Sequence, residues 1–332
     1  MEVEGTNRAL VIGAQGVLGG LTARALTAAG WVVRSGARRP RPGQVEIDLG
    51  RPDSVAATVN EHELVVNTVP HPDLLAERHV LEHGGALINV SDLPAAAGRS
   101  LRAVAGGARG TVVMNAGLAP GVTAIVAADL LGRHPAAGEL EIVYTVSLAV
   151  PRGPASADFI HRGLTAMARH RTALVPLPAP FGERRCLGFG ERDAGWLGGI
   201  AEGRIVRQYV CVAEPALHER LLERNSAGAM ADLPRSLIAM RKQRAHVTAS
   251  TEPVGHWIAA IHSGRRLSVR TVECVGGFLG AARSTVVFAD ALRTQPTPRG
   301  CFDPEEIWTL SGVEAKLRAA GIAVVSRSPA PT

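Results

Sequence analysis

The stretch that decides the fold is Ala9-Leu-Val-Ile-Gly13-Ala-Gln-Gly16-Val-Leu-Gly19-Gly20. Four apolar residues suited to a buried strand lead directly into glycines spaced three apart, and a helical pattern begins at once. In a dinucleotide-binding turn, the first glycine turns the chain out of the strand, the second admits a pyrophosphate, and the third allows close packing of helix on sheet. The predicted cofactor-binding residues of this turn are Gly13, Ala14, Gln15, Gly16, Val17, Leu18 and Gly19.

The end of the next predicted strand, residues 31–35, indicates which cofactor the turn would hold. NAD-binding domains place an acidic residue there for the ribose hydroxyls, but this chain has Gly36, Ala37, Arg38 and Arg39. Small residues followed by arginines leave room for a 2′-phosphate and neutralise it, which favours NADP over NAD. The alternative is that Arg38 and Arg39 only face solvent.

Strands and helices alternate through the first third of the chain. Further strands are expected at 45–49, 64–71, 86–92 and 111–115, with helices at 17–29 and about 72–83 and a short one from 51. This alternation predicts an α/β fold, a Rossmann doubly wound parallel sheet. Ligands in such a sheet bind outside the carboxyl ends of the strands. Residues expected to bind the cofactor at these ends are Ala37, Arg38, Arg39, Asp48, Leu49, Asn67, Thr68, Val69, Pro70, Ser91, Asn115, Ala116 and Gly117.

The pattern changes after an apolar helix expected at 123–131. Strands are predicted at 141–148, 205–212 and 267–275, and helices at 214–224, 234–244, 252–264 and 280–293, followed by a helix over 305–320 and a strand from 321. We therefore expect a nucleotide-binding domain over 1–124 and an α+β domain for substrate binding or dimerisation over 125–304. The segment 305–326 is expected to pack back on the first domain.

Composition excludes several classes of protein. The chain of 332 residues is 46% hydrophobic and 20% charged, and no apolar run approaches the length of a membrane span. Its acidic start resembles neither a secretory signal nor a transit peptide, so we expect a cytoplasmic protein. The four cysteines lack metal-site spacing and are expected to be buried free thiols. The net charge of +6 lies beyond residue 124 and suits an anionic substrate or acidic partner better than a nucleic acid.

These motifs resemble the saccharopine dehydrogenase-like NADP-dependent oxidoreductases. The resemblance is carried by the glycine turn and the strand ends at 36–39, 48–49, 66–70, 87–92 and 115–121, and it continues in Gly276-Gly277, Ser284-Thr285 and the segment 299–306. It implies a bilobed fold, nicotinamide chemistry in the cleft between the lobes, and often dimerisation through the second domain. The short-chain dehydrogenases share the glycine spacing but need Tyr-x-x-x-Lys, whereas Tyr144 and Tyr209 precede Leu148 and Ala213 at that spacing.

Candidate catalytic residues are less clearly marked than the nucleotide site. His71 could donate a proton, although the alternative is a solvated loop histidine. Asp92 could orient an amine or water, or cap a helix. Tyr144 is a third catalytic candidate, and His161 could also reach the cleft. Candidate substrate-binding residues are Asp92, Pro120, Arg270 and His256, of which Arg270 could clamp a carboxylate.

The sequence thus predicts an NADPH-dependent reductase that transfers hydride to a C=N or C=O bond of a small or carrier-tethered metabolite, in a biosynthetic pathway. Alternatives are a trans-acting enoyl reductase of polyketide assembly and a non-catalytic NADP-binding sensor or scaffold. The basic segment 235–244 could dock an acidic carrier protein, or be an ordinary solvated helix face. A homodimer is expected, with no metal, membrane or nucleic-acid partner.

Overall fold

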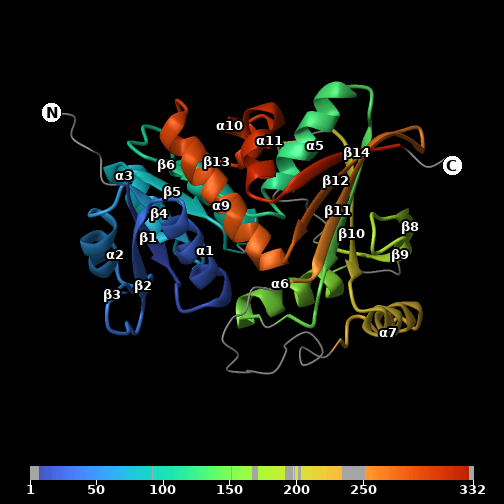
Figure 1. Cartoon of the computed structure of the whole chain (residues 1–332), viewed down its shortest axis with the longest axis horizontal. Helices are drawn as coiled ribbons and strands as arrows, with labels where there is room; N and C mark the ends of the chain where they lie inside the picture. The colour runs from blue at the N-terminus through green and yellow to red at the C-terminus, as the bar shows by residue number, and fades with distance from the viewer. Residues whose placement is uncertain are drawn as a thin grey trace. The chain divides into compact units, whose positions relative to one another are not determined.

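The computed structural model divides the chain into two compact units. It describes residues 7–91, 93, 95–150, 152–166, 171–190, 197, 199–200, 203–233 and 251–328. The first unit comprises Met1–Gly121 and Phe278–Trp308, and the second comprises Val122–Gly277 and Thr309–Thr332. Each unit is built on one seven-stranded sheet (Figure 1).

The sheet of the first unit is parallel throughout its described pairings, which confirms the predicted doubly wound fold. Its strand order is β13-β6-β5-β4-β1-β2-β3, so the chain builds outward from β1 in one direction and then from β4 in the other. The reversal creates a switch point beside β1, where ligands of such sheets bind. The strands are β1 Arg8–Ile12, β2 Val32–Ala37, β3 Val45–Glu46, β4 Leu64–Asn67, β5 Ala86–Asn89, β6 Thr111–Val113 and β13 Gly300–Phe302.

The central strands of this sheet are mostly apolar and buried, so helices pack against them. β4, for example, is buried at every residue, as expected for a strand covered on both faces. One core cluster joins Leu10 and Val65 of the sheet to Val55, Val80 and Leu101 of the helices. The helices of the first unit are α1 Val17–Ala28, α2 Pro52–Val59, α3 Leu75–His83, α4 Ala95–Val104, α9 Gly277–Thr294 and α10 Pro304–Ile307.

The second unit has a mixed sheet in the order β14-β12-β11-β7-β10-β9-β8. β7 and β10 are parallel, and the other pairings are antiparallel. The strands are β7 Glu139–Val146, β8 Thr172–Pro176, β9 Glu183–Gly188, β10 Ile205–Val212, β11 Pro253–His262, β12 Arg265–Val275 and β14 Ala323–Arg327. The helices are α5 Val122–Arg133, α6 Pro154–Thr165, α7 Pro215–Ser226 and α11 Leu310–Ala319.

Several predicted elements are wrong in type or length. The helix predicted at 252–264 is the strand β11, whose central residues are buried without alternation; a short, continuously apolar run does not distinguish helix from strand. The single helix predicted at 305–320 is broken into α10 and α11, because Trp308 is extended and Thr309 caps α11. The predicted strands 45–49 and 64–71 end early, at Glu46 and Asn67. The helix predicted at 234–244 lies outside the described residues.

The last hundred residues contribute to both sheets. β13 extends the first sheet by pairing with β6, and β14 pairs with β12 at the edge of the second sheet. The compact units therefore divide the expected segment 305–326 after Trp308, and they place 278–308 in the first unit. Among the described helices, none is long and apolar enough to cross a membrane. Cys186, Cys211 and Cys301 are buried and Cys274 is partly exposed, and the four form no disulfide with one another.

Candidate nucleotide-binding site

The glycine turn after β1 is too tightly packed for side chains at two of its glycines. Gly13 has a φ of 85°, and a Cβ there would lie 2.5 Å from Val69 Cγ2. A Cβ on Gly19 would lie 2.2 Å from the carbonyl oxygen of Gly13. The Thr68 hydroxyl donates a 2.7 Å hydrogen bond to Ile12 O, which ties the end of β4 to the end of β1. The turn is therefore shaped by backbone contact, as a dinucleotide-binding turn requires.

The N-terminus of α1 is open to an anion. Gly16 is the N-cap residue, is exposed and makes no side-chain capping hydrogen bond, and the first turn of α1 contains no acidic residue. The first amides of a helix and its dipole favour a negatively charged group at such an end. A Cβ on Gly16 would lie 3.2 Å from Gly13 O, a close contact that a small shift of the turn could relieve. These residues fit a pyrophosphate.

The end of β2 lies directly beside the glycine turn. Gly13 N–H donates a 2.9 Å hydrogen bond to Gly36 O, and Ala37 is buried. The next residues, Arg38 and Arg39, are exposed and no acid stands with them before β3. The Gln15 side chain reaches from the turn to this loop, where Nε2 donates to Arg39 O at 2.8 Å. The loop next to the turn therefore has no acidic residue where NAD-binding domains place their ribose ligand.

A buried glutamate joins the ends of β4 and β5. Glu77 Oε1, on α3, accepts hydrogen bonds from Asn67 Nδ2 at 2.8 Å and from Asn89 Nδ2 at 2.6 Å, and Glu77 is only 1% exposed. The Oδ1 atom of Asn67 accepts from Val69 N–H, and that of Asn89 accepts from the N–H and hydroxyl of Ser91. Two strand-end turns are therefore fixed by one carboxylate. Sequence reasoning identified Asn67 and Ser91 but missed Glu77 and Asn89.

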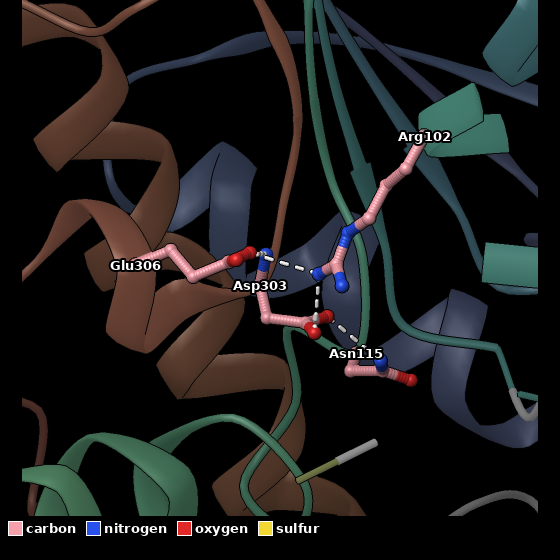
Figure 2. A network of polar contacts seen from close by, with 4 residues as sticks. All are labelled: Arg102, Asn115, Asp303 and Glu306. Atoms are coloured by element: carbon pink, nitrogen blue, oxygen red, sulfur yellow. Dashed lines mark hydrogen bonds and ion pairs between the residues drawn. The ribbon is translucent and has the colours of Figure 1, made fainter. Parts of the chain in front are cut away.

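A second polar network fixes the end of β6 (Figure 2). Asn115 has a φ of 53° and donates through Nδ2 to Asp303 Oδ1 at 2.8 Å. Arg102, from α4, contacts Asp303 Oδ2 at 2.5 Å and Glu306 Oε2 at 2.8 Å. Burial raises the pKa of Asp303, against the lowering influence of Arg102 and Asn115. Neither Arg102 nor Asp303 was identified from sequence, because 201 residues separate them along the chain.

The carboxyl group of Glu305 lies next to this network but outside its hydrogen bonds. Its Oε2 atom is buried and has no hydrogen-bond partner among the residues that the structure describes. Burial, together with the neighbouring Asp303, raises the pKa of Glu305 to about 8. Glu305 is therefore protonated at neutral pH in the folded protein.

Other candidate residues of the first unit have structural partners. Asp48 Oδ1 accepts from Gly50 N–H at 3.0 Å, and its own N–H donates to Ser54 on α2. Leu49 is buried in the core, so packing alone explains an apolar residue at this position. His71 is partly exposed and lies 3.8 Å from Asp73. The loop after Asn115 is held by Ala116 N–H, which donates to Asn89 O, and contains the cis peptide before Pro120.

The candidates in the second unit are mostly buried in its interior. Tyr144 donates to Gln208 Oε1 at 3.2 Å, and burial raises its pKa well above the usual value. His256 Nδ1 accepts from Thr145 N–H, and burial lowers the pKa of His256 to about 4. Arg270 lies 3.3 Å from Asp129.

The last two candidate residues from the sequence are His161 and Asp92. His161 Nε2 lies 2.9 Å from the carbonyl oxygen of Leu233. Asp92 lies outside the described residues. Within the described part of the chain, no cluster of His, Cys, Asp and Glu side chains could hold a metal ion.

Comparison with solved structures identifies the fold. No protein-family model matches the chain, and no curated protein matches it in sequence. Apo saccharopine dehydrogenase (L-Glu forming) from Saccharomyces cerevisiae is 12% identical with a TM-score of 0.57, over 98% of this chain and 100% of that one. DAP dehydrogenase of C. glutamicum, in complex with DAP, is 14% identical with a TM-score of 0.49, over 91% and 94%. The chain thus has a saccharopine dehydrogenase-like fold.

Proposed function

We propose that this protein is an NADPH-dependent oxidoreductase that reduces a C=N or C=O bond of a small or carrier-tethered metabolite. The observation that carries the proposal is the open glycine turn at the switch point of the first sheet, with arginines in place of an acid after β2. A structural glycine turn would not need an uncapped, acid-free helix end beside a cationic loop. An anionic dinucleotide accounts for both features.

The residues that would hold the cofactor lie on successive strand ends. The pyrophosphate would meet the first amides of α1, which begins at Val17, because Gly16 N–H already donates to Gly13 O at 2.8 Å. The adenosine ribose would meet the loop that begins at Arg38. Asn67, Ser91 and Asn115 direct their side-chain hydrogen bonds back into the protein, so we propose that they shape the turns on which the cofactor rests. When bound, the reduced nicotinamide would supply the hydride.

The proton for the reaction must come from the protein, the substrate or water. His71 is the candidate proton donor of the first unit, and its ring is partly exposed. Buried His256 is neutral at pH 7 and so cannot act there as a cationic acid, whereas Tyr144 keeps its proton. If the substrate is an iminium ion, its nitrogen is already protonated. We therefore favour a C=N substrate, for which no strong protein acid is required.

Likeness in fold to a saccharopine dehydrogenase that forms L-Glu supports an amino-acid-like substrate. Arg270 would recognise the carboxylate of that substrate in exchange for its present contact with Asp129. The positive charge of the chain beyond residue 124 suits such an anion. We also propose that the protein is a cytoplasmic homodimer, which size-exclusion chromatography with light scattering would test. If the protein prefers the reduced cofactor, NADPH, a role in biosynthesis would be consistent with that preference.

The test is to measure oxidation of NADPH with a panel of 2-oxo acid and amine pairs, aldehydes and enoyl thioesters, with product identification by mass spectrometry. Turnover with imine- or carbonyl-forming substrates is expected. Turnover with enoyl thioesters alone would indicate C=C reduction, and tight NADPH binding without turnover on any substrate would indicate a sensor. Either result would contradict the proposed reaction.

A pair of variants at Gly16 tests the site itself. Gly16→Asp introduces a good N-cap residue, so α1 should remain folded, but its carboxylate repels the pyrophosphate. Gly16→Ser has a similar capping side chain without the charge. We expect NADPH binding to weaken much more in Gly16→Asp than in Gly16→Ser, with similar thermal stability. Equal loss in both variants would attribute the effect to size and not to an anion at this helix end.

A further inference from the structure

Gln15 and Gln44 form a hydrogen-bonded bridge between the glycine turn and the loop after β2. Gln15 Nε2 donates to Gln44 Oε1 at 2.7 Å and to Arg39 O at 2.8 Å. Gln44 Oε1 also accepts from Arg41 N–H at 3.0 Å, and Gln44 N–H donates to Arg41 O at 2.9 Å. These four contacts, here called the glutamine clasp, join two segments that are more than twenty residues apart in the sequence.

The clasp holds residues 38–44, a loop with three arginines, against the glycine turn. Residues 38–44 read Arg-Arg-Pro-Arg-Pro-Gly-Gln, and the three arginines are exposed. The two hydrogen bonds that reach the loop from the glycine turn are both donated by Gln15 Nε2. One goes to the carbonyl oxygen of Arg39 and the other to the side chain of Gln44. The guanidinium groups themselves make none of these contacts, so the clasp leaves them available while it restricts the backbone that carries them.

We propose that the glutamine clasp positions this arginine loop for the 2′-phosphate and thereby sets the preference for NADPH over NADH. The inference rests on the proposed function, because it assumes that the glycine turn holds a dinucleotide. Gln15 belongs to the turn that would meet the pyrophosphate, yet its amide is committed to the loop. The pyrophosphate and 2′-phosphate subsites are therefore held in register before ligand binds, which lowers the ordering cost of binding.

The expected effect is moderate and selective. Hydrogen bonds between neutral, solvent-accessible groups contribute little each, so loss of the clasp should weaken NADPH binding about three- to tenfold. NADH lacks the 2′-phosphate and gains nothing from an ordered arginine loop, so its affinity should not change in Gln44→Ala, whose side chain lies outside the glycine turn. Gln15→Ala removes both contacts between the turn and the loop, so it should weaken NADPH binding as much as the double variant does. Gln44→Ala keeps the contact between Gln15 and Arg39 O, so its effect should be smaller.

The experiment measures dissociation constants of NADPH and NADH by calorimetry on the full chain, for the wild type and these three variants. Gln295→Ala, the same change outside the loop, is the matched control. Hydrogen exchange of the ligand-free protein provides a readout independent of cofactor. The Arg41 amide donates to Gln44 Oε1, so it should exchange faster in Gln44→Ala than in the wild type.

The outcomes separate the clasp from the proposed function. If the wild type binds NADPH and Gln44→Ala weakens NADPH alone, the proposal is supported. If Gln44→Ala weakens NADPH and NADH equally, or weakens neither, the clasp does not set cofactor preference, although the proposed function stands. Unchanged exchange at Arg41 would show that the clasp does not form. A wild type that binds neither nucleotide would overturn the proposed function and the clasp proposal with it.

Discussion

The ion pair between Arg102 and Asp303 gives a quantitative test of the network at the end of β6. Asp303 accepts from Asn115 through one oxygen and contacts Arg102 through the other (Figure 2). Replacing Arg102 by Met keeps the aliphatic stem and removes the cation. The Asp303 carboxylate then keeps its hydrogen bond from Asn115 but loses its charge partner in a buried position.

The exposure of the two side chains sets the magnitude. Removing one partner of a fully buried pair costs about 3–5 kcal/mol, whereas an exposed pair contributes about 1 kcal/mol or less. The Asp303 side chain is 7% exposed and that of Arg102 is 35% exposed, so water replaces part of what the cation supplied. We expect Arg102→Met to lower the free energy of unfolding by about 2 kcal/mol, or Tm by about 4–8 °C for a unit of about 150 residues.

The pH dependence has a definite sign. Burial already raises the folded-state pKa of Asp303 above the unfolded value, and loss of Arg102 raises it further. A carboxyl group with a raised folded-state pKa loses stability as pH rises from its unfolded to its folded pKa. The unfolded-state pKa is the same in both proteins and cancels in their difference. The destabilisation of Arg102→Met relative to wild type should therefore be full above the folded-state pKa of Asp303 in the variant, and shrink as the pH falls from that pKa to the lower one of the wild type.

The assay is thermal unfolding by calorimetry at neutral and acidic pH. Arg99→Met, an exposed position on the same helix, is the matched control, and it should leave Tm unchanged. Asp303→Asn added to Arg102→Met removes the stranded charge and should recover part of the loss. The reasoning is refuted if Arg102→Met is no less stable than Arg99→Met, or if the second substitution adds its own full cost.

Three further predictions concern the first unit. Because the pKa of Glu305 is raised from 4.5 to about 8, wild-type stability should fall as pH rises between these values, and Glu305→Gln should remove that loss in calorimetric Tm measurements. Glu77→Ala leaves two buried amides without their acceptor and should cost about 2–5 kcal/mol in urea unfolding, unlike Glu82→Ala on the exposed face of α3. Phe288→Ala, at a fully buried position, should cost about 3–5 kcal/mol, whereas exposed Val32→Ala should cost little.

Much of the first sheet could be predicted because its signals are local. The glycine turn, the apolar strands and the glycine after α1 are all read within a few residues of the element they define. β13 could not be found this way, because three residues after Arg299 carry no strand pattern of their own. They become a strand only by pairing with β6, far away in the sequence.

The second sheet was less predictable because burial there erases the pattern. β11 lies between β7 and β12, so eight consecutive residues are buried and no alternation remains to distinguish a strand from a helix. β8 and β9 fall in a polar, glycine- and arginine-rich region in which no strand was predicted. Their structure follows from antiparallel pairing with each other and with β10.

The candidate site shows the same division between local and distant information. Asn67 and Asn115 could be found because they lie in the last residues of predicted strands, but their partners Glu77 and Asp303 could not. Each of these carboxylates meets its amide only in the folded protein. No fixed spacing in the sequence therefore marks the pair.

The partners also change what the strand-end amides can do. Both oxygen and nitrogen of the Asn67 side chain are used within the protein, and Asn115 Nδ2 is held by Asp303. Side chains already bonded in this way contribute by fixing the backbone, since a ligand would have to break those contacts to use them. Recognition of a dinucleotide at this edge would therefore depend on main-chain amides and on the arginine loop. That is why we expect the charge at Gly16 and the order of residues 38–44 to matter more for binding than any single strand-end amide.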